Sequence, residues 1–215
     1  MKIQIREPIN SISHLVGCIL SAIGFLYLLS QTIPTGNQIK IISSIIFSIG
    51  LIGLYSASTI YHWSTLPLKA LATLRKIDHI MIYFLIASTY TPICLITLKG
   101  RIGYTLLTIV WTLAVTGIIL KVFWNNAPRL LYTSFYIVLG WSAIFVVYPL
   151  ATRLAISGFL LIVLGGISYT IGGIIYALKP ARLKIWKFGY HEIFHIFILV
   201  GSILHYITIY KYIIC

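Results

Sequence analysis

The chain has 215 residues, of which 60% are hydrophobic and 9% are charged, and its formal net charge is +13. A soluble domain carries about 25% charged residues, so this composition excludes a water-facing globular fold. The cations lie between apolar runs and form no stripe with interleaved aromatic residues, which argues against nucleic acid as a partner. Membrane lipid is therefore the expected surrounding and partner of most of the chain.

Apolar runs of about 20 residues, the length that crosses a bilayer as a helix, follow one another along the chain. The first begins near Ser11, and we interpret it as a span and not as a cleavable signal, because no Ala-x-Ala-like site follows it. The runs cover residues 11–30, 40–62, 77–98, 102–123, 131–150, 154–178 and 191–212. Because the connections are short, we expect an all-α fold, a seven-transmembrane helix bundle forming a single integral membrane domain over residues 1–215.

Local signals refine these spans in chain order. Asn10 and Ser11 can cap the first helix, and Pro92 is expected to kink the third. In the sixth run, glycines recur seven residues apart, which favours close packing against a neighbouring helix. These glycines are Gly165, Gly166, Gly172 and Gly173.

Lys and Arg residues between the runs are distributed unevenly over the two sides of the membrane. One side carries Lys2, Arg6, Lys69, Arg75, Lys76, Lys121, Arg129, Lys179, Arg182, Lys184 and Lys187. The other side carries Lys40, Lys99, Arg101, Arg153 and Lys211. Because cytoplasmic loops are enriched in Lys and Arg, we expect the N-terminus in the cytoplasm and the C-terminus outside.

Rare ionisable groups converge at the cytoplasmic end of this topology. His62 closes the second span, Asp78 opens the third, and His191 and His195 open the seventh. Ionisable side chains within spans are expensive and point to function. His191 and His195 project from one helix face because they are four residues apart. With His62 they offer three imidazoles, and three protein ligands with an open position are typical of catalytic zinc.

Two further side chains fit such a site. Asp78 is a candidate general base, and Ser58, one turn before His62, faces the same way. No thiolate is expected near the site, so the ligands favour Zn²⁺ over copper(I), while iron and manganese stay open. Without a metal, the histidines would form an interhelical hydrogen-bond cluster. We expect His79 at the membrane interface and His205 far from the metal.

His191, Glu192 and His195 also spell H-E-x-x-H, the zinc signature of many metalloproteases. A soluble-type metalloprotease would need a third ligand downstream, and the sequence continues for only 20 residues after His195. We therefore interpret Glu192 as incidental. A membrane-embedded protease with Asp78 as a ligand remains an alternative.

Motifs along the whole chain resemble those of the hemolysin III proteins, bacterial relatives of the adiponectin and progestin receptors, which are grouped with alkaline ceramidases. The resemblance begins with E-P-I-N-S-I-S-H, which contains Glu7, Asn10 and His14. It continues with S-T-I-Y-H, R-K-I-D-H and T-Y-T-P, and ends with F-G-Y-H-E-I-F-H. For the group of Glu7, Asn10 and His14, capping and hydrogen bonding that fix the first span are the simpler interpretation.

The resemblance implies that His62, His191 and His195 hold zinc near the cytoplasmic face and that Asp78 contacts it through water. Ser58 matches the serine of the family's S-x-x-x-H motif, and the receptor relatives carry glutamine where this chain has Glu192. The implied activity is hydrolysis of lipid amides such as ceramide. For such an enzyme we expect a lipid substrate that enters sideways from the bilayer. The alternative is a non-catalytic sensor or a membrane-damaging hemolysin with structural zinc. The expected location is a bacterial inner membrane, and the oligomeric state stays open.

Overall fold

The computed structural model describes residues 4–124, 127–180, 183, 185–186 and 188–215. The regular structure of these residues is helical, apart from an isolated β-bridge between Ile185 and Phe188. Four cations used to predict the orientation lie outside the described residues. They are Lys2, Arg182, Lys184 and Lys187.

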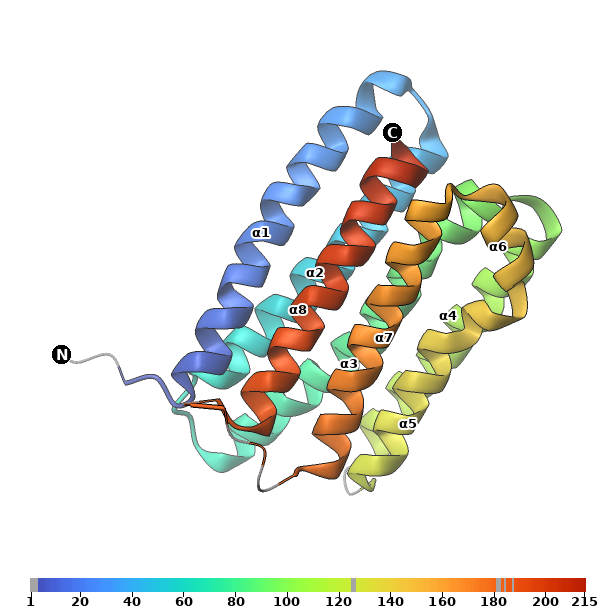
Figure 1. Cartoon of the computed structure of the whole chain (residues 1–215). Helices are drawn as coiled ribbons and strands as arrows, with labels where there is room; N and C mark the ends of the chain where they lie inside the picture. The colour runs from blue at the N-terminus through green and yellow to red at the C-terminus, as the bar shows by residue number, and fades with distance from the viewer. Residues whose placement is uncertain (1–3, 125–126, 181–182, 184, 187) are drawn as a thin grey trace.

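Seven helical segments of the described chain are long and apolar enough to cross a membrane, which confirms the predicted all-α bundle (Figure 1). The segments are built from α1 (Pro8–Thr32), α2 (Gln38–Trp63), α3 (Leu68–Pro92), α4 (Gly100–Phe123), α5 (Arg129–Gly140), α6 (Val147–Arg153), α7 (Ile156–Leu178) and α8 (Tyr190–Thr208). Short stretches of other helix types extend them: Ile33–Thr35 after α1, Ile93–Leu98 after α3, Trp141–Val146 between α5 and α6, and Ile209–Ile214 after α8.

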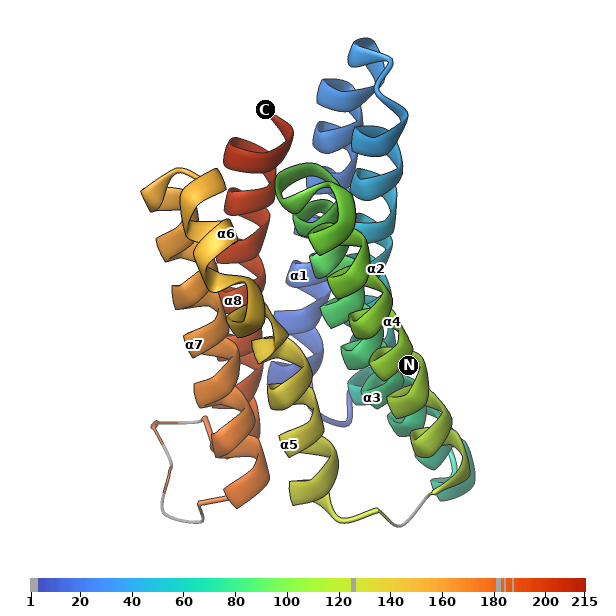
Figure 2. The ribbon, with the colours of Figure 1, turned by 90° about the vertical axis from the view of Figure 1, so that its right-hand side faces the viewer.

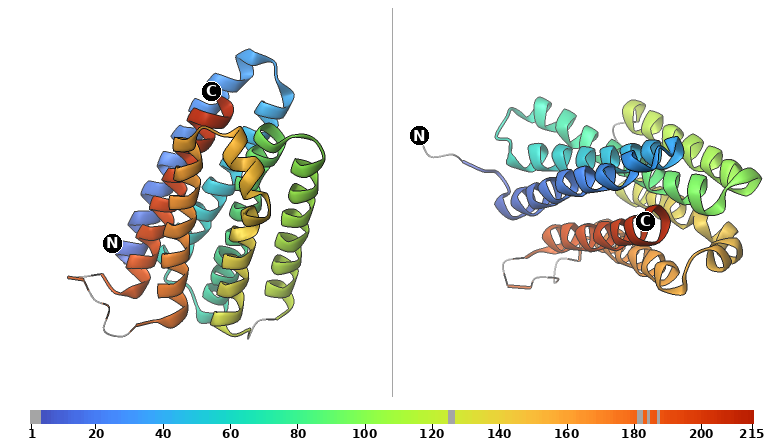
Figure 3. Two further views of the ribbon diagram at one scale, coloured as in Figure 1. Left: turned by 45° about the vertical axis from the view of Figure 1, so that its right-hand side comes forward. Right: turned by 90° about the horizontal axis from the view of Figure 1, so that it is seen from above.

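The spans form a closed ring of neighbours. Contacts run from α1 through α2, α3, α4, α5 and α7 to α8, and α8 packs back against α1. The view along the bundle shows α8 between α1 and α7 (Figure 3). Large apolar side chains such as Leu26, Leu164 and Val200 face outward, whereas Ser58 and His62 are buried. This arrangement suits a bundle whose outer surface contacts lipid and whose interior holds the polar groups.

Helix α1 begins earlier than its predicted caps. Glu7 is the N-cap and Pro8 the first helical residue, a position where the missing N–H of proline is not needed. Asn10 and Ser11 therefore lie inside the first turn, buried against the bundle, and the prediction that they cap the helix is wrong. The cap shifts because Asn10 and Ser11 form tertiary contacts.

The span of α5 and α6 is broken in the middle. Helix α5 ends at Gly140, a 3₁₀ stretch follows, and α6 resumes at Val147 (Figure 2). Tyr90 of α3 compensates for this break, since its hydroxyl donates to the Gly140 carbonyl at 2.5 Å and accepts from the Ala143 N–H at 2.8 Å. A single phenol thus bonds to two backbone groups at the break, in addition to the i→i+3 pattern of the 3₁₀ stretch.

Helices α7 and α8 approach closely, as the glycines of α7 predict. A Cβ built on Gly172 would lie 2.9 Å from the Cβ of Phe197, and one on Gly165 would lie 2.5 Å from the His205 ring. Gly166, in contrast, meets no atom within 4 Å. Two of the four glycines therefore serve packing on α8, while Gly166 borders open space.

Candidate metal centre

Three histidines from two helices come together at one end of the bundle. His62 lies in the last turn of α2, and His191 and His195 lie in the first two turns of α8. One ring nitrogen of each residue lies within 4.8 Å of the corresponding nitrogens of the other two. His62 and His195 are almost completely buried, and His191 is partly exposed. This cluster can hold a metal ion, and we call this end of the bundle the histidine end.

Two of these imidazoles present nitrogens that nothing in the described chain satisfies. The Nε2 atom of His62 and the Nδ1 atom of His195 are buried and have no hydrogen-bond partner. An unsatisfied buried polar atom costs about 1–3 kcal/mol, so this arrangement needs a compensating ligand. Neutral imidazole nitrogens that converge on one point are suitable donors for a divalent transition metal.

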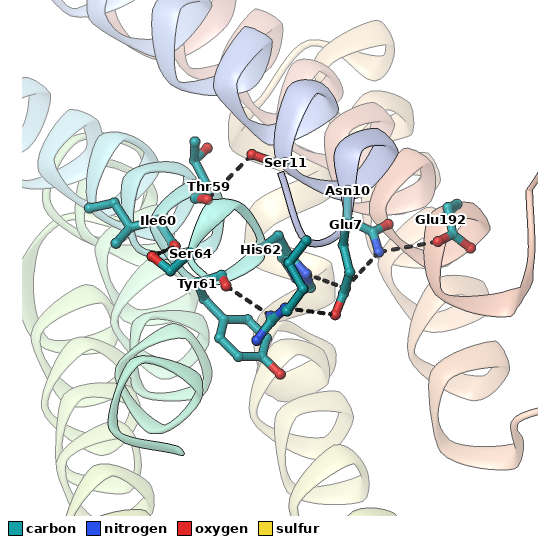
Figure 4. A network of polar contacts seen from close by, with 10 residues as sticks. Glu7, Asn10, Ser11, Thr59, Ile60, Tyr61, His62, Ser64 and Glu192 are labelled. Carbon is teal, nitrogen blue, oxygen red and sulfur yellow. Dashed lines mark hydrogen bonds and ion pairs between the residues drawn. The ribbon is translucent and has the colours of Figure 1, made fainter. Parts of the chain in front are cut away.

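Glu7 fixes the His62 ring from the side opposite to its free nitrogen. Its Oε2 atom lies 2.6 Å from Nδ1 of His62 (Figure 4). Arg6 lies 3.3 Å from the other carboxylate oxygen. The hydrogen bond with His62, together with the nearby positive charges, lowers the pKa of Glu7 to about 2, so the carboxylate is ionised at neutral pH. A carboxylate on the outer nitrogen of a metal-binding histidine is a common orienting contact.

The position of Glu7 follows from how α2 ends. The last carbonyls of a helix have no partner within it, and here they accept hydrogen bonds from the segment before α1. The Glu7 N–H donates to the His62 carbonyl at 3.1 Å, and the Arg6 guanidinium donates to the Tyr61 carbonyl at 2.8 Å. The guanidinium also lies 4.4 Å from the Tyr61 ring centre. These contacts place Glu7 beside His62.

Asn10 joins Glu7 to Glu192 and thereby connects α1 to α8. Its side-chain amide donates to Oε2 of Glu7 at 3.1 Å and to Oε1 of Glu192 at 3.2 Å (Figure 4). The other oxygen of Glu192 accepts the Gly189 N–H at 2.9 Å and so caps α8. Both oxygens of Glu192 are therefore engaged in structural contacts, unlike the free base of an H-E-x-x-H protease.

His14 is a fourth buried imidazole beside the cluster. Its ring stacks on His195 with a centroid distance of 3.8 Å and meets Tyr55 edge-on at 5.0 Å. Neither nitrogen of His14 has a hydrogen-bond partner among the described residues. The stack holds the His195 ring from one side, which places the last residue of the E-P-I-N-S-I-S-H motif next to the histidine cluster.

Asp78 and Ser58 line the cavity that adjoins the histidines. The cavity has a volume of about 310 Å³, and its wall at this end includes His191 and His195. Ser58 is almost completely buried, and Asp78 is partly exposed. Asp78 is not among the residues whose ligand atoms cluster. The structure thus places both side chains in the chamber of the histidines and outside the group that can hold a metal.

The cavity continues far beyond the predicted site. Apolar side chains line its middle, among them Leu85, Ile86, Ile137 and Ile198. At its other end lie Tyr169 and His205, so His205 belongs to the same chamber although it is far from the cluster along α8. The sequence signal was present, since His205 is an ionisable residue within a span, but its distance from His195 made it look unrelated.

His79 also differs from its expected environment. It is buried within the bundle, where its Nε2 atom lies 3.1 Å from the Tyr176 hydroxyl and its ring lies 5.2 Å from that of Tyr132. The expectation of an interfacial residue placed the start of this span at residue 77, whereas α3 begins at Leu68 and His79 lies about three turns inside it.

Comparison with known proteins agrees with these features. The family model described as haemolysin-III related matches residues 3–206. A hemolysin-3 homolog of Bacillus subtilis (strain 168) is 42% identical over 199 residues, covering 92% of this chain and 90% of the relative. Hemolysin-3 of Bacillus cereus is 35% identical over 208 residues, covering 97% and 92%.

A more distant similarity extends to animals. The monocyte to macrophage differentiation factor of Homo sapiens is 26% identical over 175 residues, covering 80% of this chain and 70% of the relative. Together with the seven apolar helices, these matches indicate a multi-pass membrane protein, consistent with a bacterial cell membrane. The chain belongs to the haemolysin-III related family.

Proposed function

We propose that this protein is a zinc-dependent hydrolase of lipid amides of the ceramide type. The observation that carries the proposal is the junction of a metal-binding cluster with an elongated, largely apolar chamber. His62, His191 and His195 form the cluster, and two of their nitrogens are buried without partners. The chamber of about 310 Å³ begins at His191 and His195 and continues between apolar side chains. A polar head and an acyl chain would fit these two parts.

The donor set supports zinc as the metal. Three imidazoles without a thiolate suit Zn²⁺, and a site with three protein ligands leaves room for a reactant. The cysteines of the chain, Cys18, Cys94 and Cys215, are free and take no part in the cluster. A zinc ion would act as a Lewis acid that polarises the amide carbonyl and makes water a stronger nucleophile.

The side chains around the cluster have separate roles in this proposal. Asp78, which lines the chamber beside the histidines, accepts the proton from the attacking water and delivers it to the leaving amine. Ser58 donates a hydrogen bond to the Asp78 carboxylate or to the substrate. Glu7 holds His62 in the orientation that directs Nε2 toward the cluster.

A lateral route for the substrate is supported by the wall between α5 and α7. Gly140 and Trp141 line the chamber and are also exposed on the outside of the bundle. A Cβ on Gly140 or Gly166 would meet no atom within 4 Å. Trp141 crosses this region and donates to Thr170 at 2.8 Å. A membrane lipid could therefore enter from the bilayer between these helices.

The first test is metal content combined with hydrolysis. Detergent-purified protein should contain about one zinc per protomer after zinc loading, measured by elemental mass spectrometry, and His191→Ala should lose it. Asp78→Asn should keep the zinc and lose about 10²–10⁴-fold in the rate of hydrolysis of a fluorescent ceramide. Absence of zinc from the loaded wild type would contradict the proposal.

The second candidate is a membrane-damaging protein in which zinc joins α2 to α8 structurally. It is favoured by the names of the Bacillus relatives, which are hemolysin-3 and a hemolysin-3 homolog. Dye release from liposomes separates the two candidates. Lysis that persists in Asp78→Asn, with no ceramide cleavage by the zinc-loaded wild type, would support the second and exclude the first.

A further inference from the structure

His205 is a buried imidazole at the end of the chamber that lies opposite to the histidine cluster. It lies on α8 ten residues after His195, which corresponds to about 15 Å along the helix. Its ring stacks on Tyr169 with a centroid distance of 5.2 Å and an interplanar angle of 16°. Both residues line the chamber. A titratable side chain at this depth of a span calls for a partner or a function.

The neighbouring helix leaves space for this ring. A Cβ on Gly165 of α7 would lie 2.5 Å from both Cε1 and Nδ1 of His205. A larger residue at position 165 would therefore displace the imidazole. The glycine and the Tyr169 stack together hold the ring in one orientation.

The hydrogen bonds of His205 leave one nitrogen available. Nδ1 lies 2.8 Å from the Gly201 carbonyl of the same helix, and a carbonyl can only accept, so Nδ1 carries the proton. A neutral imidazole has one N–H, and Nε2 is therefore an acceptor. Nε2 has no hydrogen-bond partner among the described residues and is not among their occluded polar atoms, which leaves it accessible from the chamber.

The other polar groups near this end are already paired. The Tyr169 hydroxyl lies 2.9 Å from the Ser202 hydroxyl, which also accepts from Tyr55 at 2.6 Å. Thr170 donates to the Gly166 carbonyl at 2.7 Å and accepts from Trp141. Each of these hydroxyls has a partner within the protein, whereas Nε2 of His205 has none among the described residues, so this acceptor remains for a ligand that supplies a donor.

We infer that the far end of the chamber is a subsite for a hydroxyl group on the acyl chain of the ligand. The inference rests on the proposed function in that an acyl chain occupies the chamber. This subsite narrows the proposed substrate from lipid amides in general to lipid amides whose acyl chain carries a hydroxyl group. The separation of about 15 Å corresponds to about 12 carbon–carbon bonds counted from the reacting carbonyl, because each bond of about 1.5 Å advances an extended zigzag chain by about 1.25 Å.

The test is a binding measurement that requires neither metal nor turnover. Purified full-length protein in nanodiscs is titrated with 12-hydroxyoctadecanoic acid and with octadecanoic acid, in competition with a fluorescent fatty acid. The wild type should bind the hydroxy acid about fivefold to tenfold more tightly, the range of one added hydrogen bond. His205→Phe, which keeps a ring on Tyr169 and removes the acceptor, should bind both acids equally.

Two controls complete the measurement. His205→Gln retains an acceptor and should restore part of the preference, while 2-hydroxyoctadecanoic acid should bind the wild type no better than the plain acid. Equal affinity of the wild type for the 12-hydroxy and plain acids would overturn the inference alone. Failure of both to bind would overturn it together with the lipid chamber, whereas preference without ceramide cleavage would refute only the hydrolase.

Discussion

The contact between Glu7 and His62 determines how one imidazole of the cluster is aimed. The carboxylate holds Nδ1 at 2.6 Å, so the opposite nitrogen faces His191 and His195. Orienting carboxylates of this kind change metal affinity by about 10–100-fold when they are removed. In the proposed metal site, affinity would therefore be set partly by Glu7, a residue outside the three histidines.

We expect Glu7→Gln to weaken zinc binding about tenfold, because the amide can still accept from Nδ1 but carries no charge. Competition with a chelating dye on purified protein measures this change. Glu192→Gln is the matched control, since it makes the same change at a carboxylate that contacts Asn10 and Gly189 and not His62. An unchanged zinc affinity in Glu7→Gln would show that His62 is oriented by other contacts.

Glu192 provides a second test at the scale of one residue. Its oxygens accept from Gly189 and Asn10, so Glu192→Gln should retain zinc and most of the hydrolytic rate. A general base of a metalloprotease would instead lose about 10²–10⁴-fold on the same change. Rates of ceramide and casein cleavage, compared with those of Asp78→Asn, discriminate between these outcomes.

The sequence allowed the clustering of the three histidines to be predicted but not the surroundings of the cluster. The spacing of His191 and His195, and the position of His62 at the end of an adjacent span, follow from helix periodicity and topology. The links of Glu192 to Asn10 and of His205 to the chamber depend on how each helix is rotated about its axis. Tertiary packing sets that rotation, and a single sequence does not reveal it.

Among the elements, the broken span of α5 and α6 depends on a contact with α3. Pro149, just after the 3₁₀ stretch, cannot donate to the Phe145 carbonyl and favours a distortion there, but the apolar pattern of the segment is continuous and does not indicate a break as early as Gly140. The structure instead pairs the freed groups of Gly140 and Ala143 with the Tyr90 hydroxyl. The break is a property of two helices together.

Removal of this hydroxyl should destabilise the bundle. Tyr90→Phe leaves the Gly140 carbonyl and the Ala143 N–H without their partner, at a cost of about 1–3 kcal/mol. For a chain of this size, each kcal/mol lowers the melting temperature by about 2–4 °C. Thermal unfolding in detergent measures the shift, and Tyr104→Phe, at an exposed position of α4, is the control. Equal melting temperatures for Tyr90→Phe and the wild type would mean that other groups pair with the Gly140 carbonyl and the Ala143 N–H.

For the whole molecule, composition and span length were sufficient to predict seven helices in a membrane, because the bilayer imposes both. The ring of contacts that closes between α1 and α8 was not predictable from them. This ring of contacts brings the E-P-I-N-S-I-S-H motif beside α8. As a result, the histidine end is assembled from α1, α2 and α8.

The predicted orientation can be tested with single cysteines. In a variant with Cys18→Ala and Cys94→Ala, the exposed Cys215 should react with a membrane-impermeant maleimide on intact cells. Thr65→Cys, in the connection between α2 and α3, should react only after permeabilisation once Cys215 is also replaced by alanine. The opposite pattern would place the histidine end outside, against the excess of Lys and Arg on that side.

The dependence of the broken span on Tyr90 has a consequence for biogenesis. A segment that enters the bilayer alone finds no partner there for free backbone groups, each of which costs several kcal/mol. The stretch around Gly140 should therefore remain helical while residues 129–153 insert, with Pro149 as the one interruption, and should rearrange only when it docks against α3. The chamber wall formed by Gly140 and Trp141 would then be completed after insertion, in the last stage of assembly.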